Sequence, residues 1–184
     1  GQHDAQLLAR LAAREDDALR EVVASHASKV HRVAWRMLGE AQEAEDLTQE
    51  AILRLWDHAP RLHAKGGAFR MEAWLVRVAT NLAFDRLRTL KRVSGDEPPD
   101  RADEGPIADV SIEKEQERSA ARALVEALPE RQRAAIVLTY YEELANAEAA
   151  AVLEMKLKAF ESLLHRARAA LRKAFEERDQ GKGA

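Results

Sequence analysis

Apolar residues recur along most of the chain at spacings of three and four, the period of an amphipathic α-helix. In the first half the stripes comprise Leu7, Leu8, Leu11 and Ala12; Ala18, Val22 and Val23; Val30, Val33, Ala34 and Met37; Leu47, Ala51 and Leu55 with Ile52 and Trp56 beside them; and Met71, Trp74, Leu75, Val78, Leu82 and Leu87. Gly39 and Pro60 are placed to end helices, and Gly66-Gly67 to form a loop. No alternating run is long enough for a sheet, so the pattern predicts an all-α fold.

The second half predicts helices over 113–127 and 130–141, separated by Leu128-Pro129, and a further helical segment from Asn146 onward. Between the halves, three of the five prolines and most of the local acids fall in a stretch of low apolar content. Such a composition is typical of a flexible, self-repelling linker. We therefore expect two small helical domains, residues 1–92 and 113–178, joined by a flexible acidic linker, 93–112, and followed by a frayed tail, 179–184.

Composition excludes several classes of protein. The 184 residues include no cysteine, which removes disulfides and thiol chemistry, and no apolar run is long enough to span a membrane. We therefore expect a cytoplasmic protein without membrane insertion. The six histidines are scattered, and neither a phosphate-binding glycine loop nor a nucleophile elbow is present. We expect no enzyme activity, no metal and no cofactor.

Charge is unevenly distributed, although the net charge is only −3. Residues 65–92 carry seven bases and two acids, and residues 145–175 carry six bases and three acids. Two such blocks would present two faces that attract phosphate. Ordinary solvated helix faces would give the same counts, so charge alone leaves both interpretations open.

Two helical segments carry polar residues at spacings that place them on one helix face. Asp46, Gln49 and Glu50 share one face at spacings of three and four, which suits docking of a basic helical partner or simply a solvated acidic face. Asn81, Asp85 and Arg88 share a face of the helix over 71–92, where an Asn amide could read a base edge. The alternative there is a local ion pair between Asp85 and Arg88.

Four segments resemble the extracytoplasmic-function (ECF) group of bacterial RNA polymerase sigma factors. Residues 43–56 are similar to its region 2 pattern D-A-E-D-L-x-Q-E-x-F-x-x-x-W, and residues 71–88 to F-x-A-W-L-x-R-I-A-x-N-x-x-x-D-x-x-R, with Met71 in place of Phe. Residues 128–133 match the L-P-x-x-x-R entry of region 4, and residues 146–168 its helix-turn-helix. The matches follow the family's order around an acidic linker and cover most of the chain.

The resemblance implies a transcription initiation factor with two kinds of contact in its first domain. Asp46, Gln49 and Glu50 would face the clamp helices of the polymerase β′ subunit. Asn81 and its neighbours, with the loop 65–69, would open the minus-10 promoter element, where the family captures an unstacked base. The residues expected to bind minus-10 DNA are Lys65, Arg77, Asn81, Arg86, Arg88, Lys91 and Arg92.

The second domain would dock on the β flap and read the minus-35 element as duplex DNA. Phe160, Leu163, Leu164, Ala167 and Leu171 form the predicted buried stripe of the last helix. On the opposite side, Lys158, Glu161, Ser162 and His165 are candidates for base readout in the major groove. Arg166, Arg168 and Arg172 are better placed to position the helix on phosphate.

The turn of the helix-turn-helix departs from the family. Glu154 stands where the family has Gly, and Lys156 stands where it has Ser or Thr. A non-glycine residue in the left-handed region costs roughly 1–2 kcal/mol, and a missing helix cap roughly 1 kcal/mol. A loosely folded region 4 or one continuous helix over 147–175 would follow if these costs prevailed. We expect the bent motif, because the flanking matches are good.

Two other functions fit the same helices. One is a DNA-binding regulator that never contacts polymerase. The other is a sigma-like adaptor that binds a protein partner but no DNA. The resemblance also implies an inhibitory partner, an anti-sigma factor, that covers the polymerase-binding faces.

Overall fold

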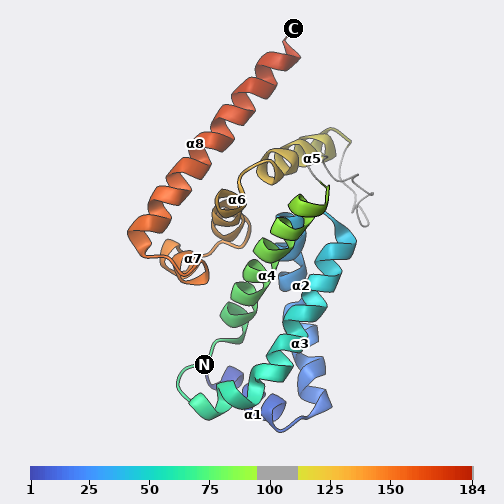
Figure 1. Ribbon diagram of the computed structural model, residues 1–184, viewed down its shortest axis with the longest axis vertical. Helices are drawn as coiled ribbons and strands as arrows, with labels where there is room; N and C mark the ends of the chain where they lie inside the picture. The colour runs from blue at the N-terminus through green and yellow to red at the C-terminus, as the bar shows by residue number, and fades with distance from the viewer. Residues whose placement is uncertain (95–111, 184) are drawn as a thin grey trace.

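A computed structural model describes residues 1–94 and 112–183, and within these ranges the regular structure is entirely helical (Figure 1). Residues 95–111, most of the expected linker 93–112, lie outside the described residues. None of the described helices is long and apolar enough to cross a membrane.

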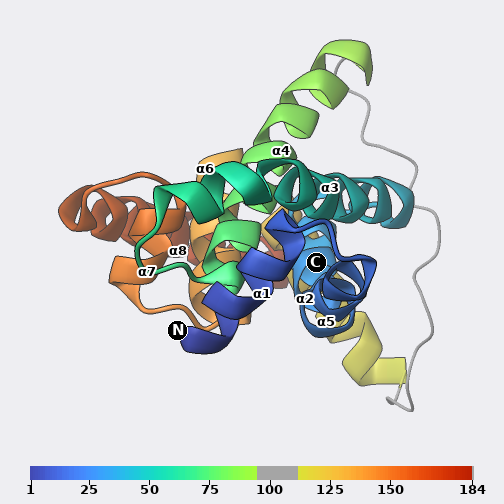
Figure 2. The same cartoon turned by 90° about the horizontal axis from the view of Figure 1, so that it is seen from below.

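The first half forms a bundle of four helices, α1 (Gln2–Ala12), α2 (Asp16–Leu38), α3 (Ala41–Lys65) and α4 (Met71–Ser94). Helices α3 and α4 pack on α2, and α1 covers the C-terminal end of α3 (Figures 1 and 2). The predicted stripes supply the core, including the fully buried Leu7, Leu11, Val22, Met37, Leu47, Leu55, Met71 and Leu75. Val23 is an exception, since its side chain is exposed.

Helix α3 continues past Pro60, where the sequence pattern predicts its end. Proline lacks the N–H that would bond to the carbonyl of Trp56, four residues earlier. Arg14 supplies the missing donor, because its Nη1 lies 2.6 Å from the Trp56 oxygen and its guanidinium stacks 4.8 Å from the indole. With that carbonyl satisfied and Leu62 packed against the core, the helix runs on to Lys65.

The second half contains α5 (Ile112–Glu126), α6 (Glu130–Ile136), a π-helical turn η1 (Val137–Tyr141), α7 (Asn146–Val152) and α8 (Leu157–Lys182). Its largest fully buried side chains are Phe160, Leu138, Ile136 and Leu164. The helix α8 extends to Lys182, beyond residue 178 where the sequence predicts a frayed tail. Its last turns are rich in good helix formers, and Lys173 pairs with Glu177 one turn later at 4.0 Å.

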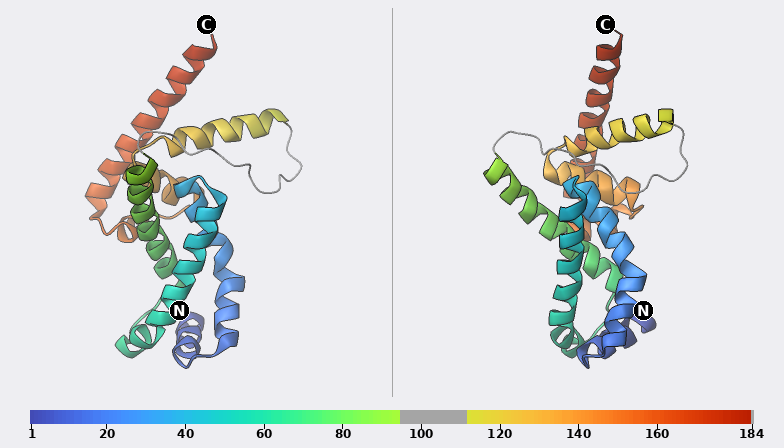
Figure 3. Two further views of the ribbon diagram at one scale, coloured as in Figure 1. Left: turned by 45° about the vertical axis from the view of Figure 1, so that its right-hand side comes forward. Right: turned by 90° about the vertical axis from the view of Figure 1, so that its right-hand side faces the viewer.

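The two halves lie in contact, with η1, α6 and α7 against the sides of α2 and α4 (Figures 1 and 3). Buried residues of both halves belong to one continuous apolar cluster. The long α8 projects away from this contact, so its outer face is open to solvent (Figure 3).

Candidate nucleic-acid interface

The face of α3 predicted to carry Asp46, Gln49 and Glu50 is only partly exposed. Asp46 and Gln49 are exposed, and Asp46 accepts a hydrogen bond from the amide of Gln42 at 3.0 Å. Leu53 follows one turn after Gln49 and is 56% exposed, an unusual fraction for a leucine of this bundle. Its spacing of seven from Asp46 could have identified it in the sequence, because positions i and i+7 share a helix face.

Arg86 occupies a different place from the one predicted. Its guanidinium, on α4, bonds to the carboxylate of Glu43 and lies 3.2 Å from that of Glu50, both on α3. Burial lowers the pKa of Arg86, but the hydrogen bonds that it donates to the two carboxylates raise the pKa above its ordinary value. Arg86 therefore joins α3 to α4 through these carboxylates, and both Arg86 and Glu50 are half-buried.

The outer face of α4 carries Arg77, Asn81, Asp85 and Arg88, all exposed and aligned along the helix. Arg88 pairs with Asp85, the local ion pair that the sequence offers as an alternative, and Arg77 pairs with Glu154 of the second half. Asn81 lies exposed between these pairs. Lys91 and Arg92 are exposed in the last turn of the helix.

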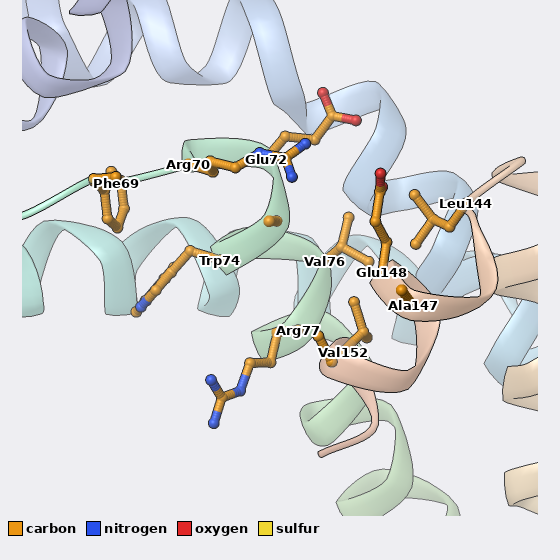
Figure 4. A pocket seen from close by; sticks show the side chains of 13 residues that line it. Phe69, Arg70, Glu72, Trp74, Val76, Arg77, Leu144, Ala147, Glu148 and Val152 are labelled. Carbon is orange, nitrogen blue, oxygen red and sulfur yellow. The ribbon is translucent and has the colours of Figure 1, made fainter. Parts of the chain in front are cut away.

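The loop before α4 borders a cleft between the halves of the molecule. Lys65 is exposed at the end of α3, and Gly66 and Gly67 both have positive φ, which frees the chain to reverse. Phe69 and Trp74 belong to the lining of a cleft of about 570 Å³ that residues of α7 also line, and their rings are directed away from α7 (Figure 4). An aromatic-lined cleft beside exposed cations is the combination that a single-stranded base and its phosphate require.

The helix-turn-helix forms in the bent shape despite the substituted turn. Glu154 adopts the left-handed conformation with φ of 56°. Its N–H bonds to the Ala151 carbonyl at 3.1 Å, and the Met155 N–H bonds to that of Ala150 at 2.9 Å. This pair of bonds defines a Schellman motif, which satisfies carbonyls at the end of α7. Lys156 then begins α8 in an extended conformation without a side-chain cap.

The face of α8 that the sequence predicts to read bases is exposed. Lys158, Glu161, Ser162, His165 and Arg166 are exposed and line one open hollow. Phe160, Leu163, Leu164 and Ala167 bury the opposite side of the helix. Base-reading candidates therefore sit together at the N-terminal end of a helix that projects into solvent, as major-groove reading requires.

Arg168 is held in place by a neighbouring side chain. Arg168 donates from Nε to the hydroxyl of Tyr140 in η1, and its guanidinium lies 5.6 Å from that ring. Tyr140 was not identified in the sequence, because a π-helical turn carries no signal in helical periodicity. Arg172 is exposed one turn further along.

The geometry thus defines a class of protein: an all-helical factor with an acidic helix face, a basic helix beside an aromatic cleft and a helix-turn-helix. Family models agree, since residues 22–93 match sigma-70 region 2 and residues 118–171 match sigma-70 region 4.

Similarity to individual proteins identifies the group within the sigma-70 family. The chain is 31% identical over 172 residues to the ECF RNA polymerase sigma factor SigM of Mycobacterium tuberculosis, covering 91% of this chain and 82% of the relative. It is 36% identical over 156 residues to the ECF sigma factor SigE of Mycolicibacterium smegmatis, covering 83% of this chain but only 59% of that relative. The chain belongs to the ECF group of RNA polymerase sigma factors, the initiation factors that direct polymerase to promoters.

A solved structure shares the arrangement of helices. The sigma factor RpoE of Bartonella quintana, in a co-crystal structure with the anti-sigma factor NepR, aligns with a TM-score of 0.66 and 18% identity. The alignment covers 88% of this chain and 98% of that one. At this identity the match supports the fold alone.

Proposed function

We propose that the face of α3 formed by Asp46, Gln49, Glu50 and Leu53 binds the clamp helices of the β′ subunit of core polymerase. The exposed Leu53 beside a carboxylate and an amide gives an apolar anchor within a polar rim, the usual anatomy of a protein interface. Arg86 supports this face from beneath and is left out of the DNA-binding set.

The minus-10 element would be opened along α4 and the loop before it. Arg77, Arg88, Lys91 and Arg92 would hold phosphates, with Lys65 at the loop, while Asn81 offers an amide to a base edge. The cleft beside Phe69 and Trp74 has the aromatic walls that an unstacked base needs. Arg77 and Arg88 would exchange their present carboxylate partners for phosphate.

The minus-35 element would be read by α8 in the major groove. Lys158, Glu161, Ser162 and His165 would meet base edges, with Arg166 and Arg172 on the flanking phosphates. Arg168 would act through its bond to Tyr140, which holds the helix against η1. The same domain would dock on the β flap.

The domains proposed for these roles are residues 1–92 and 113–178, acting in the cytoplasm where polymerase and promoters are. An anti-sigma factor is the expected inhibitor, and the co-crystallised Bartonella relative supports this partner class. The observation that carries the whole proposal is the exposed acidic face of α3 on the same bundle as the basic face of α4.

Transcription from a candidate promoter by purified core polymerase, with and without the protein, tests this function. We expect promoter-dependent transcript only when the protein is present. Asp46→Lys should abolish core binding, whereas Asp16→Lys, an equally exposed acid on α2, should leave it unchanged.

Each of the two competing functions predicts a different result when binding to core polymerase and binding to DNA are measured. DNA binding that persists while wild-type protein never binds core would favour a polymerase-independent regulator. Core binding without salt-dependent DNA affinity would favour an adaptor, because phosphate contacts through several cations weaken steeply with salt.

A further inference from the structure

The hollow on the outer side of α8 contains one acid among cations. Its lining consists of Lys158, Ala159, Glu161, Ser162, His165 and Arg166. Lys158 and Arg166 carry positive charge there, and Glu161 is the one carboxylate of that lining. Binding of a DNA duplex through phosphate alone makes no use of a negative charge, because the phosphates repel it. The presence of Glu161 in this lining therefore calls for a partner other than phosphate.

The side chain of Glu161 is not engaged by its own chain. Residues three and four positions away on a helix are the possible local partners, and for Glu161 the polar ones are Lys158 and His165. Within residues 1–94 and 112–183, however, no ion pair and no side-chain hydrogen bond includes Glu161. Further along α8, Lys173 and Glu177 do pair at a spacing of four, with Nζ and Oε1 4.0 Å apart. The exposed Glu161 carboxylate thus has both oxygens available as acceptors.

The backbone that carries Glu161 is held by the core of the second half. Phe160, the preceding residue, is fully buried, and Leu164, close to one turn later, is 1% exposed. Because α8 begins at Leu157, Glu161 lies in its second turn. The N-terminal turns of a recognition helix are the part that meets base edges in the major groove. Glu161 is therefore presented to bases on a rigid support.

The chemistry of the major groove limits the bases from which a carboxylate can accept a hydrogen bond. An ionised carboxylate accepts hydrogen bonds and donates none. Guanine presents N7 and O6 in that groove, and thymine presents O4, all of which are acceptors. Opposite either base, the Glu161 carboxylate would lose water without gaining a donor, which weakens binding. The donors that remain are the amino groups at N4 of cytosine and N6 of adenine.

Cytosine suits the carboxylate better than adenine does. Adenine places its N7 acceptor beside the N6 amino group, and a side-chain amide matches this pair because it both donates and accepts. A carboxylate would accept from N6 but would leave N7 against a negative charge. The cytosine edge offers the N4 donor without a second acceptor beside it. Its paired guanine adds N7 and O6, which are acceptors for cations such as Lys158 and Arg166.

We propose that Glu161 determines specificity by accepting a hydrogen bond from N4 of a cytosine in the minus-35 element. This inference rests on the proposed function and adds to it the base that one position must hold. Guanine and thymine at that position are rejected because they leave the carboxylate unpaired, and adenine is disfavoured by its N7. Since Glu161 also repels phosphate, it lowers the affinity for every sequence that lacks the cytosine.

Selection from a library of DNA duplexes tests this assignment. The chain, alone and bound to core polymerase, is mixed with duplexes that carry a randomised segment, and the retained duplexes are sequenced. We expect one position at which wild type retains cytosine about five- to tenfold more often than guanine or thymine. Glu161→Gln should change the preferred base at that position to adenine, and Glu161→Lys should change it to guanine.

Glu176→Gln is the matched control, because Glu176 is an exposed acid further along α8 and the substitution removes the same charge. It should retain the wild-type preference at every position. Both glutamine variants should bind all duplexes more tightly, since each removes a charge that phosphates repel. The ratio between bases at one position, rather than the overall affinity, therefore reports base reading. Urea unfolding should be the same in both variants as in wild type, because both side chains are exposed.

Equal base preferences in wild type and Glu161→Gln would overturn the assignment, and so would a selection in which wild type prefers cytosine at no position. The selection with the chain alone contains no polymerase, so its result is independent of core binding. A negative selection would leave promoter-dependent transcription standing as the test of sigma function. Absence of that transcription would, conversely, leave intact a cytosine preference that responds to Glu161.

Discussion

The two helices proposed to face DNA, α4 and α8, differ in the state of their charges. On α4, Arg77, Arg86 and Arg88 all pair with carboxylates of this chain. On the face of α8 proposed to read bases, the ion pairs among the described residues leave out Lys158, Glu161, His165 and Arg166. A preformed surface on α8 therefore contrasts with a conditional one on α4, where DNA must displace existing partners.

This difference shows that the exposure of an arginine side chain does not by itself tell whether the side chain is free to bind DNA. Arg77 and Arg168 are both exposed arginines, but one is held by the opposite half of the chain and the other by Tyr140 of its own half. Separating the halves would release Arg77 and leave Arg168 in place. Changes that act on one half only should therefore separate the two surfaces.

The largest expected effect follows from removing the centre of the second core. Phe160→Ala should lower the free energy of unfolding by about 3–5 kcal/mol, because Phe160 is fully buried beneath the recognition face. Urea denaturation measures this loss, and minus-35 duplex binding should vanish with it. Phe175→Ala, on the exposed part of the same helix, is the control and should change stability by less than about 0.5 kcal/mol. Equal losses in the two variants would contradict the placement of this core.

A smaller loss of stability is expected when the side chain that joins the two halves is replaced. Arg133→Met keeps an unbranched side chain but removes the guanidinium, which leaves the carbonyls of Met37, Glu126 and Leu128 without their donor. We expect a cost of about 2–4 kcal/mol, from hydrogen bonds to a charged group and from desolvated acceptors. Thermal unfolding should also resolve into two transitions where wild type shows one. Arg131→Met, whose exposed guanidinium lies 5.5 Å from the Phe84 ring, should retain a single transition.

Replacing the strained turn residue should stabilise the fold while releasing α4. Glu154→Gly removes a side chain from the left-handed region and should raise the free energy of unfolding by about 1 kcal/mol. Glu143→Gly, at φ of 54°, relieves the same kind of strain outside the helix-turn-helix and should stabilise similarly. Only Glu154→Gly should also tighten single-stranded minus-10 binding. Tightening by both variants would point to flexibility rather than to the Arg77 pair.

The smallest effect concerns the missing helix cap. Lys156→Ser places a hydroxyl at the N-cap of α8, where no side chain now accepts from the first turn. We expect a gain of about 0.5–1 kcal/mol in the free energy of unfolding and little change at α4. Lys173→Ser, in the middle of the same helix, should give no gain. A loss of stability in Lys156→Ser would show that the lysine contributes an interaction that outweighs the cap.

Much of the molecule follows from local pattern. The apolar stripes place the helices, the buried faces and the outward faces of α3 and α8, because a period near 3.6 assigns each residue to a side of its own helix. The all-α fold and the family follow from the same residues. Asp46 and Gln49 on α3 and Lys158, Glu161, Ser162 and His165 on α8 are exposed where the pattern places them, whereas Glu50 is half-buried.

Tertiary structure alone decided which charges meet. Arg14 rescues the helix across Pro60 from 42 residues away, Arg86 reaches Glu43 across 43, and Arg77 reaches Glu154 across 77. Helical periodicity orders a side chain around its own axis but says nothing about the helix packed opposite. The bend at Glu154 was decided in the same way. Buried neighbours and two backbone hydrogen bonds outweigh the cost of placing a non-glycine residue in the left-handed conformation, the cost that the sequence by itself predicts.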